Sequence, residues 1–169
     1  VIITNDAPDV FPFGETIVTW QAIDEAGNFV TTTQNVSVID TTPPTLTVPA
    51  DITIDAISIA TPISIGEASA TDVTDSLPAI TNDAPFAFIL GENIVTWISI
   101  DKLGNSVSMT QKVTVQACGK PHSYYNMIFG TEEDDMVTGT NLPDLVFALG
   151  GDDIIFGEKG NDCILGGEG

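Results

Sequence analysis

The chain has 169 residues and a formal charge of −20, with 24 acidic residues, four lysines and no arginine. It therefore has no basic face that could neutralise phosphate, which excludes nucleic acid and an anionic lipid surface as partners. No apolar run approaches the roughly 18 residues of a membrane helix, so we expect no membrane insertion. Valine, isoleucine, threonine and serine are frequent and prolines are dispersed, which predicts an all-β fold of short strands.

The N-terminal two thirds contain an internal repeat. Alignment of Ile3 with Ile80 pairs residues 3–38 with 80–115 without a gap, and 22 of the 36 positions are identical. The paired prolines of DTTPP, which begins at Asp40, end one unit and stiffen a linker to the next. We therefore predict a complete unit at 40–117 and the C-terminal half of another at 1–39. Missing strands for the half unit would come from the same polypeptide upstream or from another subunit.

Each repeat contains two strands in sequence. The stretches 29–38 and 106–115 alternate between apolar and polar residues, the period of a half-buried strand. The strand before each carries a tryptophan, Trp20 or Trp97, and we predict that both tryptophans are core residues. The connecting sequence Asp-x-x-Gly-Asn predicts turns with a positive φ, at 24–28 and 101–105.

These sequences resemble one family closely. DTTPPTLTVPADITIDA, followed by FPFGETIVTWQAIDEAGN and a closing VSVID, is similar to the hyalin repeat (HYR) family. The resemblance covers about residues 1–117, although Ile89-Leu90 replaces Pro12-Phe13 of the first copy. It implies immunoglobulin-like β-sandwiches of the kind found in extracellular adhesive and matrix proteins.

After a predicted linker at 118–129, the chain divides into nonapeptides. From Gly130 it reads GTEEDDMVT, GTNLPDLVF, ALGGDDIIF and GEKGNDCIL, and a fifth repeat begins with GGEG. Position eight is always aliphatic: Val137, Val146, Ile155 and Ile164. Position six is always aspartate: Asp135, Asp144, Asp153 and Asp162.

This pattern is similar to the RTX repeat, G-G-x-G-x-D-x-U-x. The resemblance implies a calcium-binding parallel β-roll at 130–169, truncated at its C-terminal end, in which two nonapeptides form one coil. Like positions of alternate nonapeptides would then stack, with the aliphatic side chains inward. Glycine turns would aim carbonyl groups at the ion and the aspartates would add carboxylates. The implied calcium residues are Asp135, Asp144, Gly151, Asp153, Gly160 and Asp162. Position four is glycine only in the last two repeats, so residues 150–162 carry the strongest prediction. The alternative is that the acids only solvate a glycine-rich loop.

Two weaker signals lie elsewhere. Aspartates of the complete unit could meet at one end of the sandwich and hold a second calcium, although turn formation explains them equally well. These residues are Asp72, Asp75, Asp83 and Asp101. The only two cysteines, Cys118 and Cys163, are predicted to form a disulfide between the linker and the β-roll, with free thiols as the alternative.

Together these features predict a secreted protein that is not an enzyme, because the single histidine, His122, supports no catalytic arrangement. The leading hypothesis is a calcium-dependent structural or adhesive module of a repeat-built cell-surface or matrix protein, such as an adhesin, surface layer or filament. Its partners would be other surface-protein subunits or extracellular ligands. One alternative is an accessory module of a secreted enzyme or toxin. Another is a homopolymer in which a neighbour completes residues 1–39.

Overall fold

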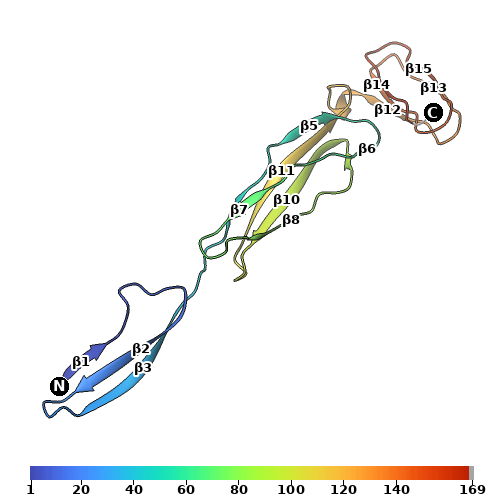
Figure 1. Cartoon of the computed structure of the whole chain (residues 1–169). Coiled ribbons are helices and arrows are strands. Elements are labelled where there is room, and N and C mark those ends of the chain that lie inside the picture. The colour runs from blue at the N-terminus through green and yellow to red at the C-terminus, as the bar shows by residue number, and fades with distance from the viewer. Residues whose placement is uncertain (168–169) are drawn as a thin grey trace.

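The computed structural model describes residues 1–167. The prediction of an all-β chain, with immunoglobulin-like sandwich repeats followed by a parallel β-roll, is confirmed. An open N-terminal sheet, a complete sandwich unit and a compact roll follow one another along an extended molecule (Figure 1). The only helical element among the described residues is a short 3₁₀ turn, η1 (His122–Tyr124). The last two residues of the predicted roll, 168 and 169, lie outside the described part.

The N-terminal sheet is a three-stranded antiparallel sheet in the order β1-β2-β3. Its strands are β1 (Ile2–Asn5), β2 (Gly14–Ile23) and β3 (Phe29–Val38). The predicted turn between β2 and β3 is present, with Gly27 at a φ of 87°, and the equivalent Gly104 has a φ of 90°. In each turn the aspartate carboxylate accepts hydrogen bonds from the backbone and side-chain amides of the asparagine.

The complete unit adds a second set of strands to the same motif. Its main sheet has the order β5-β11-β10-β8, in which β5 and β11 are parallel, and smaller sheets pair β4 with β7 and β6 with β9. The strands are β4 (Thr45–Thr47), β5 (Ile52–Asp55), β6 (Ala60–Thr61), β7 (Ser69–Thr71), β8 (Ala79–Asn82), β9 (Phe88–Ile89), β10 (Gly91–Ile100) and β11 (Ser106–Gln116). Strands β5 and β8 extend the sheet of β10 and β11, and the two smaller sheets cover its apolar face, where Leu46 of β4 and Phe88 of β9 join the core.

The core of the complete unit follows the predicted alternation. Val113 and Val115 of β11 are buried, whereas Lys112, which precedes them, is exposed. Trp97 is only 4% exposed, as predicted, but the prediction that Trp20 is a core residue is wrong, because Trp20 is 36% exposed. The reason is that among the described residues no second sheet pairs or packs with β1–β3.

The β-roll consists of two parallel sheets, β12-β14-β16 and β13-β15. Its strands are β12 (Asn126–Phe129), β13 (Met136–Thr138), β14 (Asp144–Phe147), β15 (Ile154–Phe156) and β16 (Cys163–Leu165). Asn126 pairs with Asp144, Met136 with Ile154 and Leu145 with Cys163, so each residue pairs with its counterpart two nonapeptides further along the chain. The register therefore confirms the stacking of alternate nonapeptides that the sequence predicted.

The inward position of the nonapeptides is only partly buried. Val137 and Val146 are buried and Ile155 is half-buried, but Ile164 is 46% exposed. The expectation that all four aliphatic residues face inward and are covered therefore fails at Ile164, because no described strand lies beyond β16 in its sheet.

The first strand of the roll lies inside the predicted linker. Strand β12 pairs with β14, so the sheet starts at Asn126, before the nonapeptide count that began at Gly130. The preceding nonapeptide, PHSYYNMIF, has Asn126 at position six and Ile128 at position eight. The repeat therefore extends back by one degenerate copy, with asparagine in place of aspartate.

Candidate calcium-binding site

Stacking brings the position-six aspartates together in pairs. The backbone amide of Asp135 donates to Asp153 Oδ1 at 2.9 Å, and the amide of Asp144 donates to Asp162 Oδ1 at 3.0 Å. Each pair thus joins one coil to the next through a carboxylate. The structure brings together Asp135 with Asp153, and Asp144 with Asp162, as the sequence predicted.

Threonines at the start of the first two nonapeptides hold the first aspartate of each pair. Asp135 Oδ2 accepts hydrogen bonds from the backbone amide and the hydroxyl of Thr131. Thr140 makes the equivalent bonds to Asp144, and Asn126 Nδ2 donates to Asp144 Oδ1 at 2.8 Å. Sequence reasoning missed Thr131, Thr140 and Asn126, although the Gly-Thr pair that opens both repeats was a visible signal.

Burial and hydrogen bonding act in opposite directions on Asp144, which is completely buried. Desolvation raises its pKa, but the hydrogen bonds from Thr140 and Asn126 together outweigh that effect, so the pKa lies below its usual value. Asp144 is therefore ionised at neutral pH, and its negative charge is held inside the roll.

The two position-four glycines let the coils approach each other closely. Gly151 has a φ of 103°, and a Cβ there would lie 2.7 Å from the carbonyl oxygen of Glu133 in the preceding coil. Gly160 has a φ of 141°, and its Cβ would lie 2.5 Å from the carbonyl oxygen of Leu142. A side chain at either position would force adjacent coils apart, so these glycines allow the coils their close approach. At Gly160, the Leu142 carbonyl oxygen and Asp162 Oδ1 both lie next to the position that a Cβ would take.

One oxygen in this region has no partner among the residues that the structure describes. Asp153 Oδ2 is buried and makes no hydrogen bond, whereas Asp153 Oδ1 accepts from Asp135. A buried carboxylate oxygen without a donor costs free energy unless a cation neutralises it. The salt bridges found among the described residues involve Lys102 and Lys112 of the sandwich, and neither reaches the roll.

The donor set fits a hard divalent cation. Calcium prefers six to eight oxygen ligands, from carboxylates and backbone carbonyls, and tolerates irregular geometry. Carboxylates of Asp135 and Asp153, with carbonyls of the turn around Gly151, would hold one ion, and Asp144 and Asp162 with the turn around Gly160 would hold another. Such an ion would neutralise the stacked acids and join adjacent coils.

A second acidic group lies at the other end of the complete unit. Carboxylate oxygens of Asp40, Asp72 and Asp101 lie within 4.8 Å of one another. Asp40 was not among the predicted ligands, because the contacts that bring it to this group are long-range in the sequence. One of them is the hydrogen bond that the side-chain amide of Asn105, 65 residues later in the chain, donates to the Asp40 carbonyl. Hydrogen bonds from Thr42 and Thr74 lower the pKa of Asp40, and backbone amides of Asp75 and Thr74 lower that of Asp72.

The structure places two predicted members of this group elsewhere. Asp75 accepts from the backbone amide of Lys102 and lies 3.5 Å from the Lys102 ammonium. Asp83 Oδ1 accepts the backbone amide of Thr96, as Asp6 does for Thr19 in the other repeat. Both carboxylates therefore have structural partners, and Asp72 and Asp101 are the predicted residues that converge.

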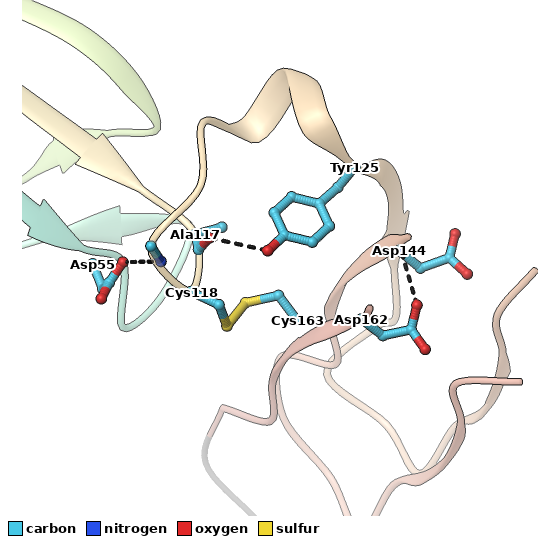
Figure 2. Close-up of a disulfide and its surroundings, with 8 residues drawn as sticks. Asp55, Ala117, Cys118, Tyr125, Asp144, Asp162 and Cys163 are labelled. Atoms are coloured by element: carbon cyan, nitrogen blue, oxygen red, sulfur yellow. Dashed lines mark hydrogen bonds between the residues drawn. A yellow bond between two sulfur atoms is a disulfide. The ribbon is translucent and has the colours of Figure 1, made fainter. Parts of the chain in front are cut away.

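A disulfide joins the sandwich to the roll. Cys118, just after β11, is bonded to Cys163 in β16, and Cys163 is 1% exposed. Figure 2 shows the disulfide on one side of β16, with Asp144 and Asp162 projecting on the other side. Tyr125 donates its hydroxyl to the carbonyl of Ala117 at 3.2 Å.

Apolar packing continues across this junction. Ala117 at the end of the sandwich forms one buried cluster with residues of the roll, which are Leu145, Phe147 and Cys163. The roll is thus fixed to the sandwich by a covalent bond and by a small shared core.

The chain is similar in sequence to two kinds of known protein. Residues 138–169 match the RTX calcium-binding nonapeptide repeat (4 copies). The chain is 38% identical over 120 residues to hyalin of Lytechinus variegatus and 35% identical over 119 residues to hyalin of Strongylocentrotus purpuratus. Each alignment covers 66% of this chain, but only 23% and 10% of the respective relatives. No solved structure is significantly similar to the chain.

The RTX match indicates that the nonapeptide segment binds calcium. It begins at Thr138, the last residue of the first predicted nonapeptide, so it covers the repeats from Gly139 onward. Among residues 1–167, the structure contains no helix that could span a membrane.

Proposed function

We propose that the chain is a calcium-dependent structural and adhesive module of an extracellular, repeat-built surface or matrix protein. The sandwich units would serve as spacers, and the roll would be a segment that becomes rigid when it binds calcium. Its partners would be other surface-protein subunits or extracellular ligands. The similarity to hyalin and to the RTX repeat supports this combination.

The observation that carries the proposal is the double connection between the sandwich and the roll, one covalent and one through apolar packing. The Cys118–Cys163 disulfide and the cluster around Ala117 attach the roll directly to the end of the sandwich. Folding of the roll therefore continues the array instead of adding a loosely tethered domain. Calcium would in this way control the length and stiffness of the assembly.

The calcium response suits a secreted protein. Extracellular modules commonly bind calcium with dissociation constants of about 10⁻⁴ to 10⁻³ M. Sites of that strength stay empty inside a cell, so the acidic roll would remain unfolded before export. It would fold afterwards, because binding to the folded state alone stabilises that state.

The aspartate group at the sandwich end is the second part of the proposal. Asp40, Asp72 and Asp101 come from the linker, the loop after β7 and the end of β10. A calcium ion bound by these three aspartates would fix the DTTPP segment, which begins at Asp40 and follows the N-terminal sheet, relative to the rest of the complete unit. A calcium titration tests this sandwich site in a variant that lacks the roll carboxylates, Asp135→Asn/Asp144→Asn/Asp153→Asn/Asp162→Asn. Calcium binding that persists in this variant would reveal the sandwich site.

Single-molecule pulling of the full chain between two handles tests the mechanical role. We expect the sandwich to unfold in a discrete event both in about 2 mM calcium, close to the concentration such modules need, and in chelator. The pulled chain carries Cys118→Ser/Cys163→Ser, because the intact disulfide would pass the force from Cys118 to Cys163 and leave residues 119–162 without load. The roll should then add resistance only in calcium. A force trace that is unchanged by chelator would contradict a load-bearing role for the roll.

The RTX match also suits an accessory module of a secreted enzyme or toxin, in which the roll would assist folding after export. The similarity to hyalin favours the adhesive role over this alternative. We propose no catalytic function for the described residues. The single histidine, His122, packs beside Gly91, so that its Cε1 lies 3.2 Å from the position that a Cβ of residue 91 would take. Its Nδ1 is buried and has no hydrogen-bond partner among the described residues.

A further inference from the structure

Strand β3 carries a glycosylation sequon on the face of its sheet that lies opposite to Trp20, here called the outer face. Asn35, Val36 and Ser37 form the motif Asn-x-Ser, in which the middle residue is not proline. No other asparagine of the sequence has serine or threonine two positions later. Such triplets also arise by chance, so the surroundings of this one decide whether it can be modified.

Both polar side chains of the sequon are accessible on the same face. Asn35 and Ser37 are exposed, and because successive side chains of a strand alternate between faces, both lie on the outer face. Val36 lies between them on the other face and is half-buried. The strand therefore presents the acceptor amide and the hydroxyl together, on an extended backbone.

The complete unit shows that this face also stays exposed in a finished sandwich. Asn35 aligns with Lys112, which is exposed although both of its neighbours, Gln111 and Val113, are completely buried. The Lys112 side chain is 46% exposed, and its ammonium lies 3.8 Å from the exposed carboxylate of Glu92. A group attached at this position of the repeat therefore projects away from the sandwich core.

An exposed apolar side chain lies directly across from the acceptor. Asn35 pairs with Ile17 of β2, and Ile17 is 67% exposed. In the complete unit the equivalent pair is Lys112 and Ile94, which is 59% exposed. Cross-strand partners on one face have Cβ atoms only about 5 Å apart. A bulky hydrophilic group on Asn35 would therefore shield Ile17 from other proteins.

We propose that Asn35 carries an N-linked glycan that is attached during export. The inference rests on the proposed extracellular function, because only exported chains meet the donor, an oligosaccharide linked to a polyisoprenoid diphosphate. Asn35 Nδ2 forms a bond to the anomeric carbon of the oligosaccharide and loses one proton. The bond between that carbon and the diphosphate oxygen breaks, and the lipid diphosphate leaves with the electron pair. The glycan shields Ile17 and keeps the outer face solvated.

The test expresses the full chain behind an added signal peptide in cultured animal cells and collects it from the medium. Intact mass before and after treatment with peptide N-glycosidase reports the glycan. Peptide mapping locates it, because the enzyme converts a glycosylated asparagine to aspartate. The internal repeat offers a matched control, since Lys112→Asn creates the sequon Asn-Val-Thr at the equivalent exposed position. The added signal peptide supplies export, so the result does not depend on adhesion or on calcium binding.

We expect one mass shift in the original chain, which the glycosidase removes and peptide mapping assigns to Asn35. Asn35→Gln and Ser37→Ala should each abolish the shift, whereas Ser37→Thr should keep it. Lys112→Asn should add a second shift of similar size. A secreted original chain without a glycan would overturn the proposal, whether or not the Lys112→Asn variant is modified. A glycan attached at another residue in place of Asn35 would overturn it as well.

Discussion

The complete sandwich unit and the β-roll hold short strands together by different means. In the sandwich, seven residues with at most 6% exposure form one apolar cluster that includes Phe88, Val95 and Trp97. In the roll, only β14 is buried along its whole length, and stacked aspartates join the coils. The sandwich therefore has an interior sufficient for its own stability, whereas the roll requires a counter-charge.

The largest expected effect is on the sandwich core. Trp97→Ala should lower the free energy of unfolding of the complete unit by about 3–5 kcal/mol, because it leaves a cavity in a dry core. Trp20→Ala is the matched control, since the equivalent side chain in the N-terminal sheet is 36% exposed. Trp20→Ala should lower the free energy of unfolding by less than about 1 kcal/mol. Urea unfolding followed by circular dichroism measures both, and equal losses would show that the two sheets are covered alike in solution.

The disulfide tests whether the two regions are coupled. Cys118→Ser/Cys163→Ser should destabilise the roll in calcium by about 2–4 kcal/mol, because the bond closes a long loop, with its cysteines 45 positions apart, in the unfolded chain. Since Cys163 directly follows Asp162, the calcium needed to fold the roll should also rise. Thermal unfolding at several calcium concentrations measures this. Unchanged calcium dependence would mean that the sandwich end does not position the last coil.

A single carboxylate separates ion binding from general acidity. Asp153→Asn should weaken calcium binding about tenfold, equivalent to about 1.4 kcal/mol, because its buried Oδ2 has no donor and is free for a cation. Asp152→Asn removes the same charge from an exposed neighbour and should change the affinity less than about twofold. Isothermal titration calorimetry on both variants distinguishes them. Similar losses would favour a diffuse charge effect over a built site.

Acid should act on the roll through Asp144. Its folded pKa is lowered, so the stability it contributes is complete above the unfolded value of about 4. That contribution is lost as the pH falls through the lower folded pKa. Thr140→Val removes one hydroxyl donor to Asp144 and should move this acid transition to slightly higher pH. Near-ultraviolet circular dichroism against pH in calcium follows it, and a transition at the same pH in both proteins would exclude Asp144 as its cause.

Periodicity explains how much the sequence could predict. The internal repeat predicted the β2–β3 and β10–β11 hairpins, and the nonapeptides predicted the stacking of alternate repeats, because both patterns repeat local structure. Asp40 was missed because the contacts that bring it to Asp101 are long-range and leave no periodic trace. Asn126 was missed because its repeat lacks glycine and aspartate. Trp20 was placed in a core that its neighbours in this chain do not complete.

Hydrogen exchange with mass spectrometry, with and without calcium, tests the central claim most directly, because it reports on both regions of the same molecule. Removal of calcium should abolish protection of β13–β16 and leave β10 and β11 unchanged, as expected if cations hold the roll together and apolar packing holds the sandwich. Equal protection of β13–β16 in calcium and in chelator would contradict the account.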